Sequence, residues 1–132
     1  MIDIFNLELL SNEKRDLMSC LISSDLNQKT FGQLYGIKLK KDAIVGNHYH
    51  KFKDEWIVLI NGKIKIYLED INTGTKKQII MDSSNPSKIR IPPYFSHAVE
   101  NISEGESILI EYATLPFNKH TEDKFPHKVS PS

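Results

Sequence analysis

Cysteine and arginine are nearly absent from this sequence. Cys20 is the only cysteine among the 132 residues, so these residues cannot form an internal disulfide or a cysteine-based zinc site. Arg15 and Arg90 are the only arginines, and the 17 basic residues balance 17 acidic ones, so the formal net charge is zero. Proteins that bind nucleic acids usually carry an excess of basic residues. We therefore expect no nucleic-acid partner.

Long apolar runs are missing as well. No stretch approaches the roughly 20 apolar residues that a membrane-spanning helix needs. The first residues, MIDIFNLELLSNEKR, lack the basic start and the apolar core of a secretory signal peptide. We expect a cytoplasmic protein without a membrane partner. With 39% apolar and 26% charged residues, the sequence is typical of a globular protein, and its length predicts one domain over residues 1–132.

Helical periodicity is scarce, and short runs rich in Ile, Val, Tyr and Phe take its place. Asn61-Gly62 is a hairpin signal between two of these runs. Many short strands at regular spacing are typical of an antiparallel sandwich or barrel, so we predict an all-β fold. The expected strands are 15–22, 31–40, 48–51, 55–60, 63–70, 75–81, 88–91, 97–101 and 106–115.

Three histidines and one glutamate form a candidate metal site. His48 and His50 alternate along an expected strand, so their side chains lie on one face. Glu55 opens the next strand, and His97 follows a turn that contains two prolines. Three imidazoles and one carboxylate suit a divalent first-row metal and leave coordination positions open for a substrate or water. The expected ligands are therefore His48, His50, Glu55 and His97.

The same residues resemble the two motifs of the cupin superfamily. The first motif is a His-x-His pair followed by Glu and Gly, which this sequence matches with His48, His50, Glu55 and Gly62. The second motif is Pro-x-Gly, then His, then Asn, which it matches with Pro92, His97 and Asn101, while Tyr94 replaces the glycine. The resemblance implies a cupin double-stranded β-helix, or jelly-roll barrel. We expect a barrel core over about 15–115 and an extended tail over 116–132.

Longer stretches are similar to the cupins of cell-surface polysaccharide synthesis, which include sugar-nucleotide epimerases, ketoisomerases and the cupin domains of capsule-synthesis enzymes. These stretches are GNHYHK, NGKIKIYLEDINTG, IPPYFSHAVENIS and LIEYATLPFNKHTEDKFPHKV. The resemblance implies an enzyme that epimerises or isomerises a nucleotide-linked 4-keto sugar by proton transfer next to the ketone. It also implies a homodimer.

The resemblance assigns roles to individual residues. His48 takes the place of the base, Tyr112 the place of the acid, and His97 the histidine place of the second motif. Tyr112 shares a strand face with Ile108 and Ile110, which we expect to be the inner face. Arg90 and Lys51 are candidates for holding a substrate phosphate or acid.

Three departures separate this sequence from these relatives. Val45 stands where they usually have an arginine, and His50 stands where the 3,5-epimerase has Gln. The long terminal additions of that epimerase are not found here either. His50 makes the chain more similar to the cupins of capsule synthesis, which can bind a metal. The substrate class is therefore implied, but the sugar is not.

Two questions stay open at the level of sequence. A histidine bound to a metal has no lone pair left to act as a base, so His48 is either a ligand or the base. The metal could be Zn, Mn, Fe or Ni, or the site could work without one. Alternative functions are a metal-dependent cupin of another type, such as a small-molecule dioxygenase or a sugar-phosphate isomerase, and a non-catalytic sugar-binding cupin.

Overall fold

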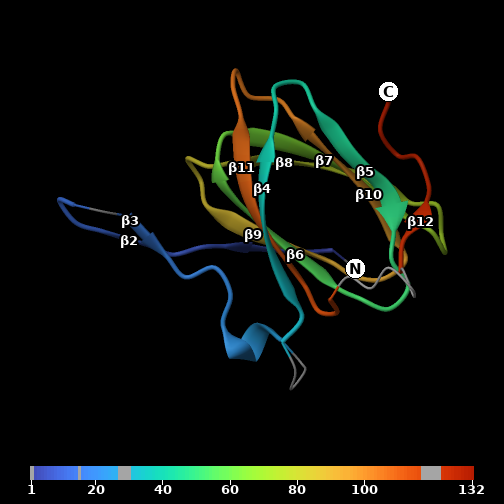
Figure 1. Cartoon of the computed structure of the whole chain (residues 1–132), viewed down its shortest axis with the longest axis horizontal. Coiled ribbons are helices and arrows are strands. Elements are labelled where there is room, and N and C mark those ends of the chain that lie inside the picture. The colour runs from blue at the N-terminus through green and yellow to red at the C-terminus, as the bar shows by residue number, and fades with distance from the viewer. Residues whose placement is uncertain (1, 15, 27–30, 117–122) are drawn as a thin grey trace.

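The fold is a cupin jelly roll made of two facing five-stranded β-sheets (Figure 1). The computed structural model describes residues 2–14, 16–26, 31–116 and 123–132. All strand pairs among these residues are antiparallel. Among them, no helix is long and apolar enough to cross a membrane.

Strands that are neighbours in a sheet are often distant in the chain, because the connections pass from one sheet to the other. In order across the first sheet, the strands are β1 (Asp3–Asn6), β9 (Ser87–Ile91), β6 (Glu55–Asn61), β11 (Ser107–Ala113) and β4 (Gln33–Leu39). In order across the second, they are β12 (Phe125–Pro126), β5 (Ile44–Tyr49), β10 (Phe95–Asn101), β7 (Lys63–Asp70) and β8 (Lys76–Asp82). A small hairpin of β2 (Leu9–Ser11) and β3 (Asp16–Met18) projects from the barrel, followed by a short 3₁₀ helix, η1 (Ser23–Asp25) (Figure 1).

The apolar core lies between the two sheets and is built from alternate strand positions. In β9, Ile89 and Ile91 face the core, as do Ile57 and Leu59 in β6. The remaining buried members of this core are Leu39, Ile64, Ile66, Leu68, Ile79, Met81, Val99 and Leu109. Burying such side chains is the main favourable contribution to folding. The polar side chains of the cavity described below lie directly beside this core, because Ile57 and Val99 belong to the core and also line that cavity.

Asn101, the asparagine of the second cupin motif, has a structural role. Its side chain is buried and donates hydrogen bonds to the backbone oxygens of Leu39 and Gly105, at 3.0 and 2.8 Å. Its Oδ1 accepts hydrogen bonds from the hydroxyls of Ser103 and Ser107. A buried amide must be satisfied in this way. Asn101 therefore holds the loop before β11 against the end of β4.

Gly62 and Tyr94 lie in two turns of the barrel, and each has a positive φ. The expected Asn61-Gly62 hairpin joins β6 to β7, and Gly62 has a φ of +100°, which favours glycine. Tyr94, which replaces the motif glycine, has a φ of +65°. Its N–H donates to the backbone oxygen of His50 at 2.7 Å. The turn is therefore kept, with a tyrosine in a conformation that bulky residues rarely adopt.

The nine expected strands correspond to β3 through β11, with shifted ends. Of the described residues in the run 15–22, which leave out residue 15, Asp16–Met18 form a strand. The strand expected at 48–51 is β5, which begins at Ile44. The sequence reasoning missed β1, β2 and β12, which are only two to four residues long. β1 and β12 extend the two sheets beyond the range 15–115 expected for the barrel core.

Candidate functional site

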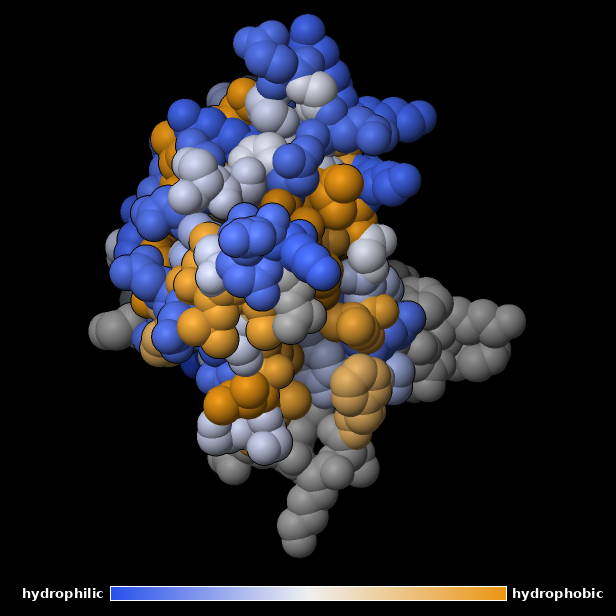
Figure 2. Space-filling view, turned by 90° about the vertical axis from the view of Figure 1, so that its left-hand side faces the viewer, coloured by the Kyte–Doolittle hydropathy of each residue, from blue (hydrophilic) through white to orange (hydrophobic). Residues whose placement is uncertain are grey.

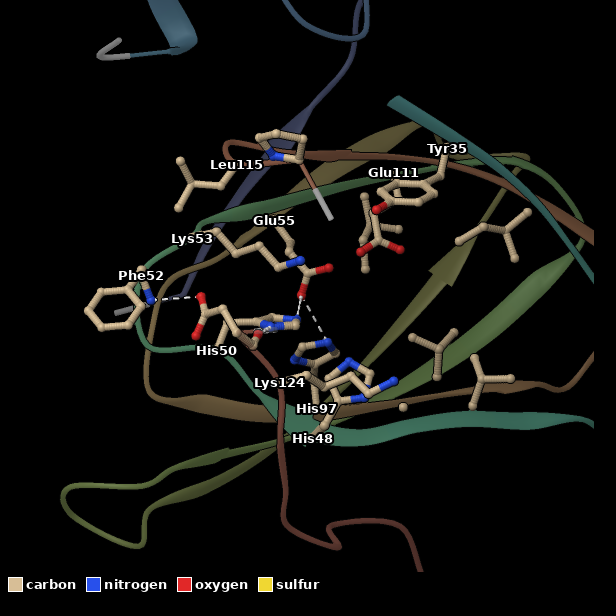
Figure 3. Close-up of a pocket in the computed structure, with 17 residues that line it drawn as sticks. Tyr35, His48, His50, Phe52, Lys53, Glu55, His97, Glu111, Leu115 and Lys124 are labelled. Carbon is tan, nitrogen blue, oxygen red and sulfur yellow. Dashed lines mark hydrogen bonds and ion pairs between the residues drawn. The ribbon is translucent and has the colours of Figure 1, made fainter. Parts of the chain in front are cut away.

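A cavity of about 750 Å³ opens between the two sheets (Figure 3). Its wall contains polar residues in an otherwise apolar lining: Tyr35, His48, His50, Lys53, Glu55, His97, Glu111, Asp123 and Lys124. A pocket of this size, with a few convergent polar groups, is typical of a small-molecule site. Among the residues that the structure describes, it is where the chemically versatile side chains gather.

Pairing of β5 with β10 brings the histidines together. His48 lies opposite His97 in the register of the two strands, and a bulge follows between His97 and Ala98. Gly46, with a φ of +103°, faces the backbone of β10 so closely that a Cβ atom would lie 2.7 Å from the His97 oxygen. The glycine therefore permits the close approach that aligns the two histidines.

The four expected ligands form one cluster. The donor atoms of His48, His50, Glu55 and His97 all lie within 4.8 Å of one another. The Glu55 Oε1 atom is 2.9 Å from His50 Nε2 and 3.1 Å from His97 Nε2 (Figure 3). His50, Glu55 and His97 are each at most 5% exposed, whereas His48 is half-buried. The geometry places the carboxylate between two ring nitrogens.

Two of the rings are oriented by backbone oxygens. His50 Nδ1 bonds to the oxygen of Asp123, and His97 Nδ1 lies 3.2 Å from the oxygen of Phe95. A carbonyl oxygen can only accept, so both rings carry a hydrogen on Nδ1 and turn Nε2 toward Glu55. Such outer contacts are the usual way in which metal-binding histidines are held. For His48, no comparable side-chain hydrogen bond occurs among the described residues.

The donor set fits a divalent metal ion. Although His50 Nε2 and Glu55 Oε1 are close, neither atom has a hydrogen-bond partner in suitable geometry among the described residues, and both are fully buried. Leaving such atoms unpaired costs free energy. A cation between them would satisfy both, and two imidazoles with one carboxylate suit Zn, Mn, Fe or Ni. His50, Glu55 and His97 would hold it, with His48 close by.

Burial and neighbouring charges set the protonation of the cluster. Burial, together with the charges of His97 and His50, lowers the pKa of His48 to about 4. Burial alone would lower the pKa of His97, but the Glu55 carboxylate outweighs it, so the pKa of His97 is raised. Burial would raise the pKa of Glu55, but the His97 charge and a hydrogen bond from Glu111 hold it well below its ordinary value. At neutral pH, His48 is therefore an unprotonated imidazole that faces the cavity.

Glu111 and Tyr35 form a second polar pair that the sequence reasoning missed. They are cross-strand partners on β11 and β4, and they lie beside Glu55 on the sheet that faces the strand of His48 (Figure 3). Burial, a hydrogen bond to Glu55 and the Glu55 charge raise the pKa of Glu111 to about 10, so its carboxyl group is protonated. Burial also raises the pKa of Tyr35, and the charges of Glu111, once it is ionised, and of Glu55 add to this effect. The alternation in QLYGIKL, with Tyr35, Ile37 and Leu39 on one face, was the signal that could have located Tyr35.

Comparison with known proteins places the chain in a family. The model of the polysaccharide biosynthesis C-terminal domain family matches residues 19–125. The chain belongs to this family. No curated protein sequence matches it significantly.

Several solved structures share the fold of this chain at low sequence identity. The capsular polysaccharide assembling protein CapF from Staphylococcus aureus has a TM-score of 0.73 and 19% identity, and the match covers 93% of this chain. The match covers 34% of the CapF chain, so the present chain spans about a third of that protein.

Two further structures were solved with nucleotide-sugar ligands. A variant of the 3,4-ketoisomerase QdtA from Thermoanaerobacterium thermosaccharolyticum, in complex with TDP-4-keto-6-deoxyglucose, has a TM-score of 0.78 and 18% identity, and 94% and 86% of the two chains are covered. The dTDP-6-deoxy-D-glucose-3,5-epimerase RmlC from Legionella pneumophila, in complex with dTDP-4-keto-L-rhamnose, has a TM-score of 0.81 and 14% identity, with 98% and 83% covered. These likenesses show the fold.

Tyr112, Arg90 and Lys51, which the sequence placed at the site, lie outside the cavity. Tyr112 does not line the cavity, because Leu109 and Glu111 occupy the inner face of β11; instead, its hydroxyl accepts a hydrogen bond from the Gly32 N–H at 2.7 Å. The expectation that Tyr112 shares the inner face is therefore wrong.

Arg90 and Lys51 are also outside the cavity. Arg90 points away from the core faced by its neighbours in β9, and its Nη2 lies 2.8 Å from the Asp54 Oδ1 atom. The Lys51 ammonium lies 4.2 Å from the centre of the Phe125 ring. The cations that do line the cavity are Lys53 and Lys124.

Proposed function

We propose that this protein is an enzyme that epimerises or isomerises a nucleotide-linked 4-keto sugar during the synthesis of a surface polysaccharide. The observation that carries the proposal is the position of the His48 ring, which lines a cavity of about 750 Å³ and belongs to a cluster of metal-type donors. Burial lowers the pKa of this ring, so that it is available as a base. Family membership supports the link to polysaccharide synthesis. The two neighbours with 4-keto sugar ligands support the substrate class.

His48 is proposed as the base rather than a metal ligand. Within the described part of the chain, its ring has no backbone anchor like those of the other two histidines, and it is less buried than they are. It takes the proton from the carbon next to the ketone, and the electrons of the broken C–H bond move into an enolate. A divalent metal held by His50, Glu55 and His97 would polarise the ketone oxygen and stabilise the negative charge of the enolate.

Tyr35 is proposed as the acid in place of Tyr112. Its raised pKa keeps the phenol protonated, and it lies across the cavity from His48, beside the protonated Glu111 (Figure 3). Return of a proton from Tyr35 to the opposite face of the carbon gives the epimer. The proton taken by His48 leaves to solvent, and solvent protons restore Tyr35. Hydrogen-bond donors of this kind also stabilise a developing enolate.

The cavity cations supply an anchor for the nucleotide part. Lys53 and Lys124 come from the turn after β5 and from the C-terminal segment, and both line the cavity (Figure 3). Their positive charges suit the diphosphate of a nucleotide sugar, as point charges rather than the planar arginine fork. They take the role that the sequence had assigned to Arg90 and Lys51.

A homodimer is proposed on the basis of the projecting hairpin. Leu9, Leu10 and Leu17 on β2 and β3 are 42%, 57% and 46% exposed, and a two-stranded hairpin is marginal in water on its own. Figure 2, which views the side that carries this hairpin, shows apolar side chains over the centre and lower part of the face. A second copy of the chain is the proposed partner that covers them.

A second candidate is a metal-dependent oxygenase. Two histidines and one carboxylate, as in His50, His97 and Glu55, are also the ligand set of non-haem iron enzymes that use oxygen. Metal analysis of the purified protein and an oxygen-consumption assay would distinguish the two activities. Bound iron together with consumption of oxygen would favour the oxygenase over proton transfer.

The proposal is tested with a panel of dTDP- and UDP-linked 4-keto sugars in deuterated water, followed by NMR. Deuterium at a carbon next to the ketone, with inversion at that carbon, would identify an epimerase. Movement of the ketone to the adjacent carbon would identify a ketoisomerase. If no member of the panel exchanges a proton, the proposed function is wrong.

A further inference from the structure

The C-terminal segment 123–130 lies along the strand that carries the histidines. β12 pairs with β5, so that Phe125 lies opposite Tyr49 and Pro126 opposite His48. The Phe125 ring stacks on the Tyr49 ring, with centroids 5.5 Å apart. In Figure 1 the segment follows the outer edge of β5. The segment is therefore an added edge strand next to the site.

Asn47 anchors the far end of this segment. Its backbone oxygen accepts the His127 N–H at 2.9 Å, and its Oδ1 accepts the N–H groups of Val129 and Ser130 at 2.8 and 3.0 Å. On β10, the Ser96 hydroxyl donates to the His127 oxygen at 2.6 Å. The segment is held by hydrogen bonds to both strands that carry histidines of the cluster.

Asp123 contacts the site directly. Its backbone oxygen accepts the hydrogen of His50 Nδ1, as described above. Its carboxylate accepts the N–H groups of Lys51 and Phe52 at 2.7 and 2.9 Å. One residue thus fixes both the His50 ring and the backbone turn that follows it. Both Asp123 and its neighbour Lys124 also line the cavity.

We infer that the C-terminal segment is part of the metal centre, with Asp123 as the positioning residue for His50. The contact of Asp123 with Nδ1 selects the tautomer whose Nε2 lone pair faces Glu55, and the carboxylate holds the turn in place. Docking of the segment on β5 therefore sets the affinity of the cluster for a divalent cation. This inference depends on the metal-binding part of the proposed function and does not require the sugar reaction.

Zinc affinity gives the first test. We compare the wild type with Asp123→Ala, Asp123→Asn and a chain that ends at residue 122, using competition for Zn²⁺ with a coloured chelator. Loss of an outer-shell partner typically weakens metal binding by about 10- to 100-fold. We expect a loss of this size for the shortened chain, which lacks the backbone oxygen that orients the His50 ring. Asp123→Ala keeps that oxygen and removes only the carboxylate that holds the turn, so its loss should be smaller. Asp123→Asn, which keeps one acceptor oxygen, should lose least.

Asp82→Ala is the matched control. Asp82 accepts hydrogen bonds from the N–H and the hydroxyl of Ser84, so its carboxylate also holds a turn, but it does not line the cavity. Its replacement should leave zinc affinity unchanged. Circular dichroism of every variant would check that the β fold is kept.

The tautomer gives a second, metal-free test. In ¹⁵N NMR of the histidine rings, His50 of the wild type should carry its hydrogen on Nδ1, and the chain that ends at residue 122 should lose this preference. A purely structural role of the segment would not change the tautomer. Absorption of bound Co²⁺ should shift in Asp123→Ala but not in Asp82→Ala.

The inference is overturned if the wild type binds no Zn²⁺, if the Asp123 variants and the shortened chain bind it as tightly as the wild type, or if the wild-type His50 carries its hydrogen on Nε2. Zinc binding with the expected losses, together with no proton exchange in any keto sugar, would leave this inference standing and remove the proposed function.

Discussion

The carboxyl group of Glu111 donates a hydrogen bond to the carboxylate of Glu55, so that two acidic side chains from neighbouring strands share one proton at the inner wall of the cavity. This arrangement is stable only if one of the two stays protonated, because like charges at short range repel. Here Glu55 is the charged partner, since the His97 charge lowers its pKa, and Glu111 is the neutral one.

This pair predicts a pH dependence of stability for the metal-free protein. The pKa of Glu111 is about 10 in the folded state and ordinarily 4.5, so the folded state holds one more proton between these values. Its favourable contribution is complete below pH 4.5 and is lost as the pH rises toward 10. Glu111→Gln cannot ionise and keeps a hydrogen-bond donor. We expect the free energy of unfolding of Glu111→Gln, relative to that of the wild type, to increase with pH. The increase should be up to about 1 kcal/mol per pH unit between about pH 5 and 8.

Urea unfolding at several pH values, in the presence of a chelator, measures this difference. The same substitution at the exposed Glu106, in the loop before β11, is the control and should show no such trend. A stability difference between Glu111→Gln and the wild type that stays constant over this pH range would contradict a protonated Glu111.

At position 94 we predict that glycine gives a more stable protein than alanine, the reverse of the usual order within a strand. Both Tyr94→Gly and Tyr94→Ala remove the ring, but only glycine adopts a φ of +65° without strain. We expect the glycine variant to be more stable than the alanine variant by about 1 kcal/mol in urea unfolding. At the exposed Ile80 within β8, the same pair should rank the other way, because glycine weakens a strand. An alanine variant at position 94 that is as stable as the glycine variant would show that this turn is not strained.

The proposed dimer predicts that the hairpin controls the mass in solution. Light scattering after gel filtration should give about twice 15.2 kDa for the wild type. Replacing Leu10 and Leu17 by Ser should shift the mass toward that of one chain, whereas replacing the nearby Glu8 and Glu13 by Ser should not. A wild type with the mass of one chain would contradict the dimer, and a dimeric Leu double variant would move the interface away from the hairpin.

The sequence predicted the strands and the metal-type cluster well, because both depend on local patterns. The spacing of His48, His50 and Glu55 specifies neighbouring positions on two successive strands, and the motif adds His97. The inner face of β11 was harder to recognise, because apolar residues occur on both of its faces and Glu111 is a charged residue by type. Tyr112 was therefore assigned to the inside in error.

Other errors have a similar physical origin. Arg90 alternates with two core isoleucines, so the alternation itself places it on the outer face, where it pairs with Asp54. Asp123 and His50 are 73 residues apart, and nothing in the pattern around either residue indicates their contact. Contacts of this kind depend on the path of the chain over the finished barrel.

The most direct test of the account combines proton exchange with metal content in the wild type, His48→Asn and His97→Asn. In deuterated water, with the keto sugar from the panel that the wild type processes, we predict that His48→Asn keeps its metal but exchanges at least about 100-fold more slowly. His97→Asn should lose the metal. Exchange by His48→Asn at the wild-type rate, or loss of its metal to the same extent as in His97→Asn, would contradict His48 as the base.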